Sequence, residues 1–291
     1  MTTQTASHSS VASASDIATA RQLIDAFEQS QAPGVWPHLE KAEVIATLRD
    51  RIANPFRLDQ KQQPFCGPTS IVFELIRKQP IRYVHMCQQL FEQGKFQGYT
   101  RTVEAPYQLR ENSRGMDMAQ ADWMLIATMR ESENLLFKVD PNAPTLVRNI
   151  AGMTKSWEMK GWTKEILGYA NVEYYHAYLL RDISAMQKAK AAIAQGGVAF
   201  ALVTAGGMYS KEDMLTRSDS KSVKKVAMPD HWIVLVDIED IPATLSWRGV
   251  AYRSDKTTLK FDTFTWARRV PVDIGRAAFR RFFWGVVIGQ P

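Results

Sequence analysis

The spacing of hydrophobic positions changes near residue 196. Before that point apolar residues recur at helical spacing, which predicts helices over residues 16–27, 38–52, 66–76, 81–92, 116–130 and 183–195. Gly196 and Gly197 suit a helix C-terminus, and beyond them the apolar positions alternate. This alternation predicts strands over residues 198–204, 231–238, 250–253, 257–266 and 282–288. Helices followed by strands favour an α+β fold with an antiparallel sheet.

The N-terminal residues 1–15 are rich in Ser, Thr and Ala and contain no apolar run. We expect them to form a disordered tail, with Asp16 as the N-cap of the first helix. They hold no basic region followed by an apolar region, so no cleavable secretory signal is expected. No linker is evident after residue 16. The pattern predicts one domain over residues 16–291, helical over about 16–195 and sheet-forming over about 196–291.

Composition limits the possible partners. The 291 residues are 45% hydrophobic and carry a net charge of +6. Basic residues are densest at Lys221, Lys224 and Lys225 and at Arg276, Arg280 and Arg281, which we interpret as solvated surface rather than a nucleic-acid site. No apolar stretch reaches the roughly 18 residues of a membrane span, so membrane insertion is not expected. Two cysteines, Cys66 and Cys87, argue for a reducing compartment such as the cytoplasm.

Cys66 stands where a helix is expected to begin. Gly67 permits a tight turn, and Pro68 suits the first helical turn, where a missing N–H is not needed. A thiol at a helix N-terminus is close to the positive end of the helix dipole, which favours the nucleophilic thiolate. The sequence here fits a reactive cysteine and a structural cysteine about equally well.

His231 differs from the other four histidines of the chain. It opens the apolar strand His231–Asp237, directly after the long polar segment 206–230. A titratable side chain at a strand end is well placed to act as a general base. A cysteine at a helix start, a histidine on a later strand and a polar residue beyond it form a nucleophile, base and orienting group.

The sequence contains no motif typical of a zinc site, a phosphate-binding loop or a serine hydrolase. The cysteines and histidines lack zinc-site spacing, no glycine-rich phosphate loop appears, and no Gly-x-Ser-x-Gly elbow is present. No metal or other cofactor is therefore expected.

The ordered set of Gln60, Cys66-Gly67, His231 and the segment 261–266 resembles the papain-like cysteine peptidase superfamily. The resemblance implies that Cys66 is the nucleophile and His231 the general base. Gln60, six residues before Cys66, would complete the oxyanion hole, with Gln62 and Gln63 less well placed.

The resemblance also implies a residue that orients His231, near an aromatic residue on a later strand. Asp262 is four residues before Trp266 and so shares its face of the strand if the alternation continues. We expect Asp262 to be this residue, with Thr265 and Asp237 as alternatives.

The implied activity is hydrolysis of an amide bond in a protein or peptide substrate through a thioester. Deamidation and acyl transfer use the same site, and a non-enzymatic binding module that keeps the fold remains an alternative. Cys66-Gly67 resembles the pattern of the bacteriocin-processing and effector-type bacterial members of this superfamily. The small size and the absence of a secretory signal resemble its toxin-like effectors. Such a protein would be delivered by a specialised secretion system and inhibited by an immunity protein.

Overall fold

The computed structural model describes residues 11–61, 63–113, 117–133, 154–177, 181–209, 228–241 and 258–291. The chain divides into two compact units, one up to Tyr169 and the other from Ala170 onward. We call them the helical unit and the sheet unit.

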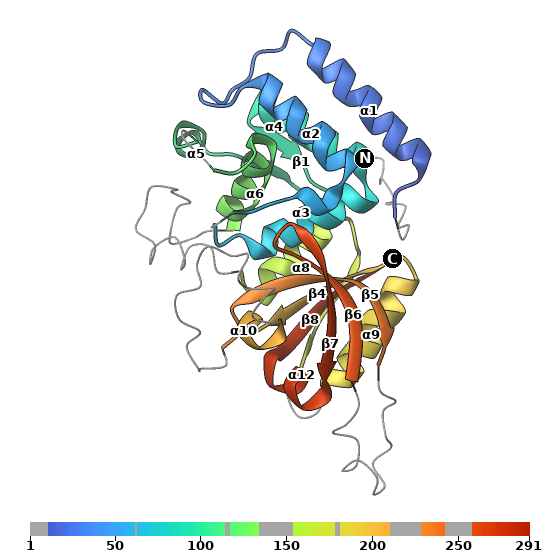
Figure 1. Ribbon diagram of the computed structural model, residues 1–291. Helices are drawn as coiled ribbons and strands as arrows, with labels where there is room; N and C mark the ends of the chain where they lie inside the picture. Colours follow the sequence, from blue (N-terminus) through green and yellow to red (C-terminus); the bar gives the residue numbers. More distant parts are fainter. Residues whose placement is uncertain are drawn as a thin grey trace, which may run out of the picture. The chain divides into compact units, whose positions relative to one another are not determined.

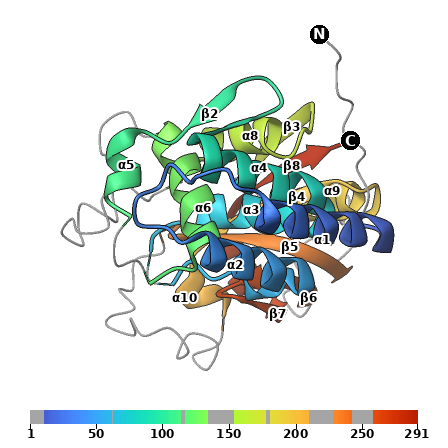
Figure 2. The ribbon, with the colours of Figure 1, turned by 90° about the horizontal axis from the view of Figure 1, so that it is seen from above.

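The helical unit surrounds one buried helix, α3 (Figures 1 and 2). Its elements are α1 (Ala14–Gln29), α2 (Lys41–Ala53), the 3-10 turn η1 (Pro55–Arg57), α3 (Cys66–Lys78), α4 (Pro80–Gln93), β1 (Lys95–Gln97), β2 (Thr102–Glu104), α5 (Tyr107–Glu111), α6 (Gln120–Glu133) and α8 (Ser156–Glu165). Helices α4, α6 and α8 pack against α3. Ile71, Val72, Phe73 and Leu75 are fully buried on α3. A run of consecutive buried apolar residues is typical of a helix enclosed in a core.

The first helix begins earlier than predicted, because its N-cap is Ser13 and not Asp16. The Ser13 hydroxyl accepts a hydrogen bond from the Asp16 N–H (3.1 Å), and the Asp16 carboxylate accepts one from the Ser13 N–H (3.1 Å). This is a reciprocal capping box in which Asp16 holds the third helical position. Residues 14 and 15 of the predicted tail are thus helical, and residues 1–10 lie outside the described ranges.

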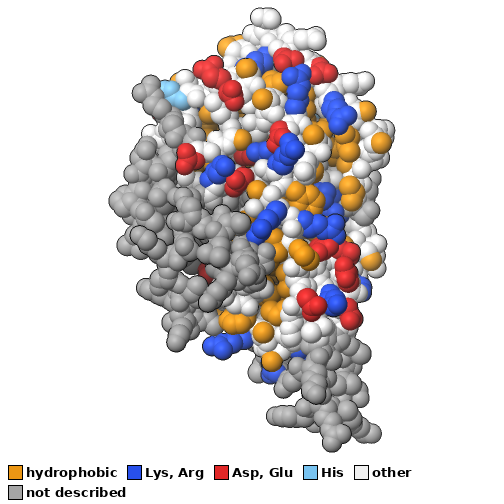
Figure 3. Space-filling model, in the orientation of Figure 1, with side chains coloured by type: hydrophobic (Ala, Val, Ile, Leu, Met, Phe, Trp, Pro, Cys, Tyr) orange, Lys and Arg blue, Asp and Glu red, His pale blue; other side chains and the backbone are white. Residues whose placement is uncertain are grey.

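Charges on the outside of the helical unit are mixed in sign. Arg49 on α2 forms ion pairs with Asp25 and Glu28 on α1 at 2.8 and 2.7 Å. Figure 3 shows acidic and basic side chains interspersed over the visible face of this unit. Interspersed charges are typical of a solvated surface.

Within the described residues, the sheet unit is built on six antiparallel strands. Its elements are β3 (Asn171–His176), α9 (Asp182–Ala194), β4 (Val198–Val203), α10 (Ala205–Met208), β5 (His231–Asp240), β6 (Thr258–Thr265), β7 (Arg268–Gly275), α12 (Arg276–Phe282) and β8 (Phe283–Gln290). The strand order is β3-β8-β4-β5-β6-β7, and every pairing is antiparallel. The predicted α+β class with an antiparallel sheet is confirmed. The strand predicted over residues 250–253 lies outside the described ranges.

In sequence, the helical unit ends at Tyr169 and the sheet unit begins at Ala170. Helix α9 contacts β8, β4 and β5 and so belongs to the sheet unit. Its residues Ile183, Met186 and Ala189 share a buried core with Ala201, Ile233 and Ile288 of the strands. The helical spacing of residues 183–195 was predicted, but its packing partner was not.

Within the described ranges, no helix combines the length and the apolar character that crossing a lipid bilayer requires.

Candidate functional site

Cys66 is the first residue of α3, as the sequence predicted. Its side chain is partly exposed, whereas the ten residues from Gly67 to Ile76 are all buried. The Thr69 N–H donates to the carbonyl of Phe65 (2.9 Å), and the Ser70 hydroxyl donates to the carbonyl of Cys66 (2.8 Å). The first turn of α3 is therefore fixed by its own hydrogen bonds.

Gln60 is held in a tight turn ahead of α3. Its side-chain amide donates from Nε2 to the carbonyl of Gln63 (3.0 Å), and the Gln63 N–H donates back to the carbonyl of Gln60 (3.1 Å). Lys61 in this turn has a left-handed backbone, with φ of 53°. A primary amide carries two N–H donors, so the bond to Gln63 uses one and positions the other. Gln63 is also buried, and Gln62 lies outside the described ranges.

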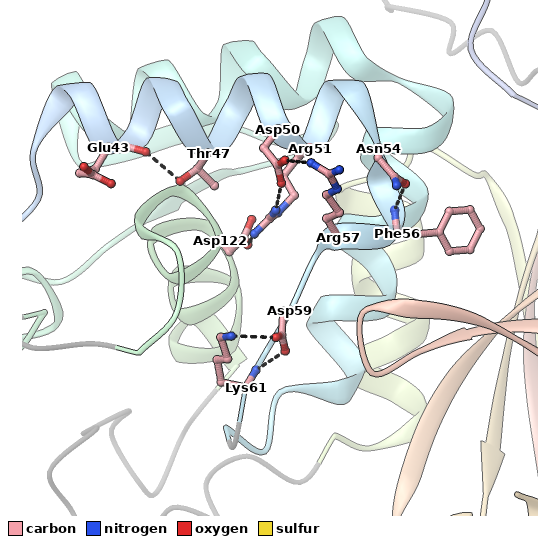
Figure 4. A network of polar contacts seen from close by, with 10 residues as sticks. All are labelled: Glu43, Thr47, Asp50, Arg51, Asn54, Phe56, Arg57, Asp59, Lys61 and Asp122. Atoms are coloured by element: carbon pink, nitrogen blue, oxygen red, sulfur yellow. Dashed lines mark hydrogen bonds and ion pairs between the residues drawn. The ribbon is translucent and has the colours of Figure 1, made fainter. Parts of the chain in front are cut away.

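Polar contacts anchor the segment that leads to this turn (Figure 4). Arg51 on α2 donates from Nε and Nη2 to the Asp122 carboxylate on α6, at 3.0 and 2.7 Å. Arg57 in η1 forms an ion pair with Asp50 on α2 (2.5 Å). The Asp59 carboxylate accepts the N–H of Lys61 (2.7 Å), which stabilises the start of the Gln60 turn.

Gly67 is required by its surroundings. A Cβ atom at this position would lie 2.3 Å from Oγ1 and 2.5 Å from Cγ2 of Thr154. The segment that leads into α8 therefore packs directly on the residue after Cys66. No local pattern in the sequence predicts this contact, because 87 residues separate the two positions.

His231 is the first residue of β5 and is only 4% exposed. Its Nε2 atom lies 2.6 Å from Oγ1 of Thr265 on β6. Register explains the meeting: Val234 is opposite Phe264, so Ile233 is opposite Thr265, and His231 shares the face of Ile233. The Trp266 ring is stacked on the imidazole, with ring centroids 5.3 Å apart and planes within 15°.

Asp262, the expected orienting residue, is not brought to His231. Alternation along β6 puts it on the sheet face opposite to Thr263 and Thr265, and its carboxylate accepts hydrogen bonds from Nε (2.9 Å) and Nη2 of Arg269 on β7. Asp237 pairs with Asp262 across β5 and β6 and lies six residues after His231 on β5. Its carboxylate accepts a hydrogen bond from the N–H of Ile238 (2.8 Å). Of the three residues considered, the structure places Thr265 against the ring.

The sequence predicts only part of the aromatic surroundings of His231. Trp266 and Ala267 form the β6–β7 turn and both have left-handed backbones, with φ of 48° and 58°. Tyr209 packs edge-on against Trp266 (4.9 Å between centroids), and its hydroxyl lies 3.1 Å from Oγ1 of Thr263. Tyr209 stands in a polar segment with no periodic pattern, so sequence reasoning could not single it out.

Among the described residues, no group of three or more His, Cys, Asp and Glu side chains is arranged to hold a metal ion. The chain matches no protein-family model, and no curated protein is significantly similar to it in sequence.

Proposed function

We propose that this protein is a papain-like cysteine hydrolase that cleaves amide bonds of a protein substrate. The observation that carries the proposal is the environment of His231. Thr265 holds its Nε2 atom at 2.6 Å, and Trp266 covers one side of the ring. A histidine whose ring is fixed at one nitrogen is the arrangement that a general base needs at the other nitrogen.

In this mechanism Nδ1 of His231 accepts the thiol proton of Cys66, because Nε2 is engaged with Thr265. The sulfur attacks the amide carbon, and the resulting tetrahedral intermediate collapses to a thioester as the imidazolium returns its proton to the departing amine. Water, deprotonated by the same imidazole, then attacks the thioester. The imidazolium returns this proton to the sulfur, so Cys66 leaves as the thiol and the acyl group is released as a carboxylic acid. The mechanism requires Cys66 and His231 to meet during the reaction.

Gln60 and the N–H of Cys66 are the donors that we assign to the oxyanion. The Gln63 carbonyl fixes the Gln60 amide. The amide therefore needs little reorientation when negative charge develops on the substrate oxygen. A preorganised donor of this kind contributes about 3 kcal/mol of transition-state stabilisation in other acyl-transfer enzymes.

Peptide-bond hydrolysis is the first reaction that we propose, with side-chain deamidation and acyl transfer as chemistries of the same site. By resemblance to bacterial effectors, the protein would act as a toxin inside another cell and have an immunity protein as its inhibitor.

The test uses the two cysteines of the chain. Cys87 is fully buried on α4, and burial raises the pKa of its thiol well above the ordinary value, so it is a matched unreactive control. We expect iodoacetamide to alkylate Cys66 of the native protein faster than free cysteine near pH 7, with Cys87 unlabelled. If Cys66 reacts no faster than free cysteine, the catalytic proposal is wrong and the fold serves as a binding module. Loss of substrate cleavage in both Cys66→Ala and His231→Ala, with unchanged melting temperatures, completes the test.

A further inference from the structure

Trp157 is a large aromatic side chain that the helical unit leaves in solvent. It is 66% exposed, although the next two residues, Glu158 and Met159, are buried. Exposed Trp is uncommon, because its apolar area is large, and it often marks a place where another molecule packs.

The turn that carries Trp157 is rigid. Glu158 accepts a hydrogen bond from the Lys155 N–H (2.5 Å) and another from Nη1 of Arg130 on α6 (3.0 Å). Both members of the Arg130–Glu158 ion pair are buried. The first turn of α8 is thus fixed to the core, and the indole projects from a fixed base.

This turn begins beside the cysteine. Thr154 packs on Gly67, the neighbour of Cys66, and Trp157 follows only three residues later. Three residues span at most about 10 Å, so the indole stands within the reach of a substrate residue a few positions from the scissile bond. Lys155 lies over the indole, with Nζ 5.5 Å from the ring centroid, and so supports the ring.

We propose that Trp157 is a specificity-determining residue, against which an apolar side chain of the substrate packs when the scissile amide is at Cys66. The inference rests on the proposed function, because it takes Cys66 as the nucleophile. It adds the class of substrate: a polypeptide with a large aliphatic or aromatic side chain close to the cleaved bond.

The experiment measures how fast tetrapeptide vinyl sulfones alkylate Cys66 of the full chain. One probe is all glycine, and the others carry a single Leu or Phe at each position in turn. Trp157→Ala and Trp157→Phe are compared with wild type, and Tyr107→Ala on α5 is the matched control, since Tyr107 is 65% exposed. Iodoacetamide, which has no peptide part, reports the intrinsic reactivity of the thiol.

We expect the best Leu or Phe probe to label wild-type Cys66 at least roughly tenfold faster than the glycine probe. Trp157→Ala should lose this preference, Trp157→Phe and Tyr107→Ala should keep it, and all iodoacetamide rates should stay the same. The inference is overturned if wild type shows no preference, if Trp157→Ala keeps it, or if Trp157→Ala slows iodoacetamide equally. Failure of the proposed function looks different, because wild-type Cys66 would then react slowly with iodoacetamide itself.

Discussion

The imidazole Nε2 of His231 and the hydroxyl of Thr265 are 2.6 Å apart across two neighbouring strands. A hydroxyl can accept a hydrogen bond from Nε2–H and donate its own hydrogen to another acceptor, so it can favour the tautomer in which Nε2 carries the proton. Unlike a carboxylate, it adds no negative charge beside the imidazolium. Under the proposed function, Thr265 therefore acts on His231 by orienting the ring and not through charge.

Thr265→Val should keep the shape of the site and remove the hydrogen bond. We expect substrate cleavage to fall by about 10- to 100-fold, and alkylation of Cys66 to require a higher pH, since the imidazolium partner is less well oriented. Thr265→Asn, which restores an acceptor, should recover part of the rate. Asp262→Asn is the control and should change the rate by less than about twofold, because that carboxylate bonds Arg269 on the other face. A larger loss in Asp262→Asn than in Thr265→Val would reverse the assignment.

The proposed pairing of Cys66 with His231 predicts a cross-link. In a Cys87→Ser background, His231→Cys should form a disulfide with Cys66 on mild oxidation, or a bridge with a short bis-maleimide, because disulfides need Cα atoms within about 7 Å. Asp262→Cys should give neither product, since its side chain leaves the opposite face of β6. Mass spectrometry of tryptic peptides detects both bridges. Equal cross-linking from the two positions would count against the site.

Gly67→Ala should destabilise the helical unit, because the new methyl would overlap Thr154. We expect a loss of about 1–3 kcal/mol in the free energy of unfolding, as for other overpacked sites. Thr154→Gly removes the obstructing side chain, so Gly67→Ala should cost less in that background, with a coupling of about 1 kcal/mol. Urea unfolding of the four proteins gives the cycle. Strict additivity would show that the two residues do not touch.

The buried pair of Arg51 and Asp122 predicts a pH-dependent stability. Burial raises the pKa of Asp122 to about 6, even though Arg51 opposes the shift, and the carboxyl also faces Tyr83, Cys87, Asp50 and Asp59. Because the folded-state pKa lies above the ordinary value, the contribution of Asp122 to stability is fully present below about pH 4 and is lost as the pH rises through 6.

Arg51→Met should therefore lower the free energy of unfolding by about 3–5 kcal/mol at pH 8, because it leaves the buried Asp122 carboxylate without its cation. The loss should shrink at pH 5, where Asp122 is protonated, and Arg51→Met/Asp122→Asn should recover much of it. Arg49→Met, which breaks exposed ion pairs, is the control and should cost less at every pH. A loss in Arg51→Met that stays constant from pH 5 to 8 would contradict the raised pKa of Asp122.

The sequence by itself determines where several helices and strands begin. Gly67 and Pro68 predicted that a helix begins at Cys66, and the apolar alternation from His231 predicted a strand that begins there. Both signals depend on residues next to one another in the chain, which is why the α+β class could be predicted. The sequence does not distinguish Ser13 from Asp16 as the N-cap, because both residue types fit a helix start, and only the hydrogen bonds assign the two residues to their positions.

What only the tertiary structure decided is which side chains meet. Strand alternation predicts that Trp266 lies on the same face of β6 as Asp262. In the structure the backbone of Trp266 is left-handed, with φ of 48°, so the alternation ends at Thr265. The Trp266 ring therefore lies on the same face as His231, against which it stacks. Likewise, Gly67 is a glycine because of Thr154, a residue far away in the chain. Strand register, a turn in an unfavourable conformation and a contact over 87 residues depend on the packed fold, so no local pattern of residues could specify them.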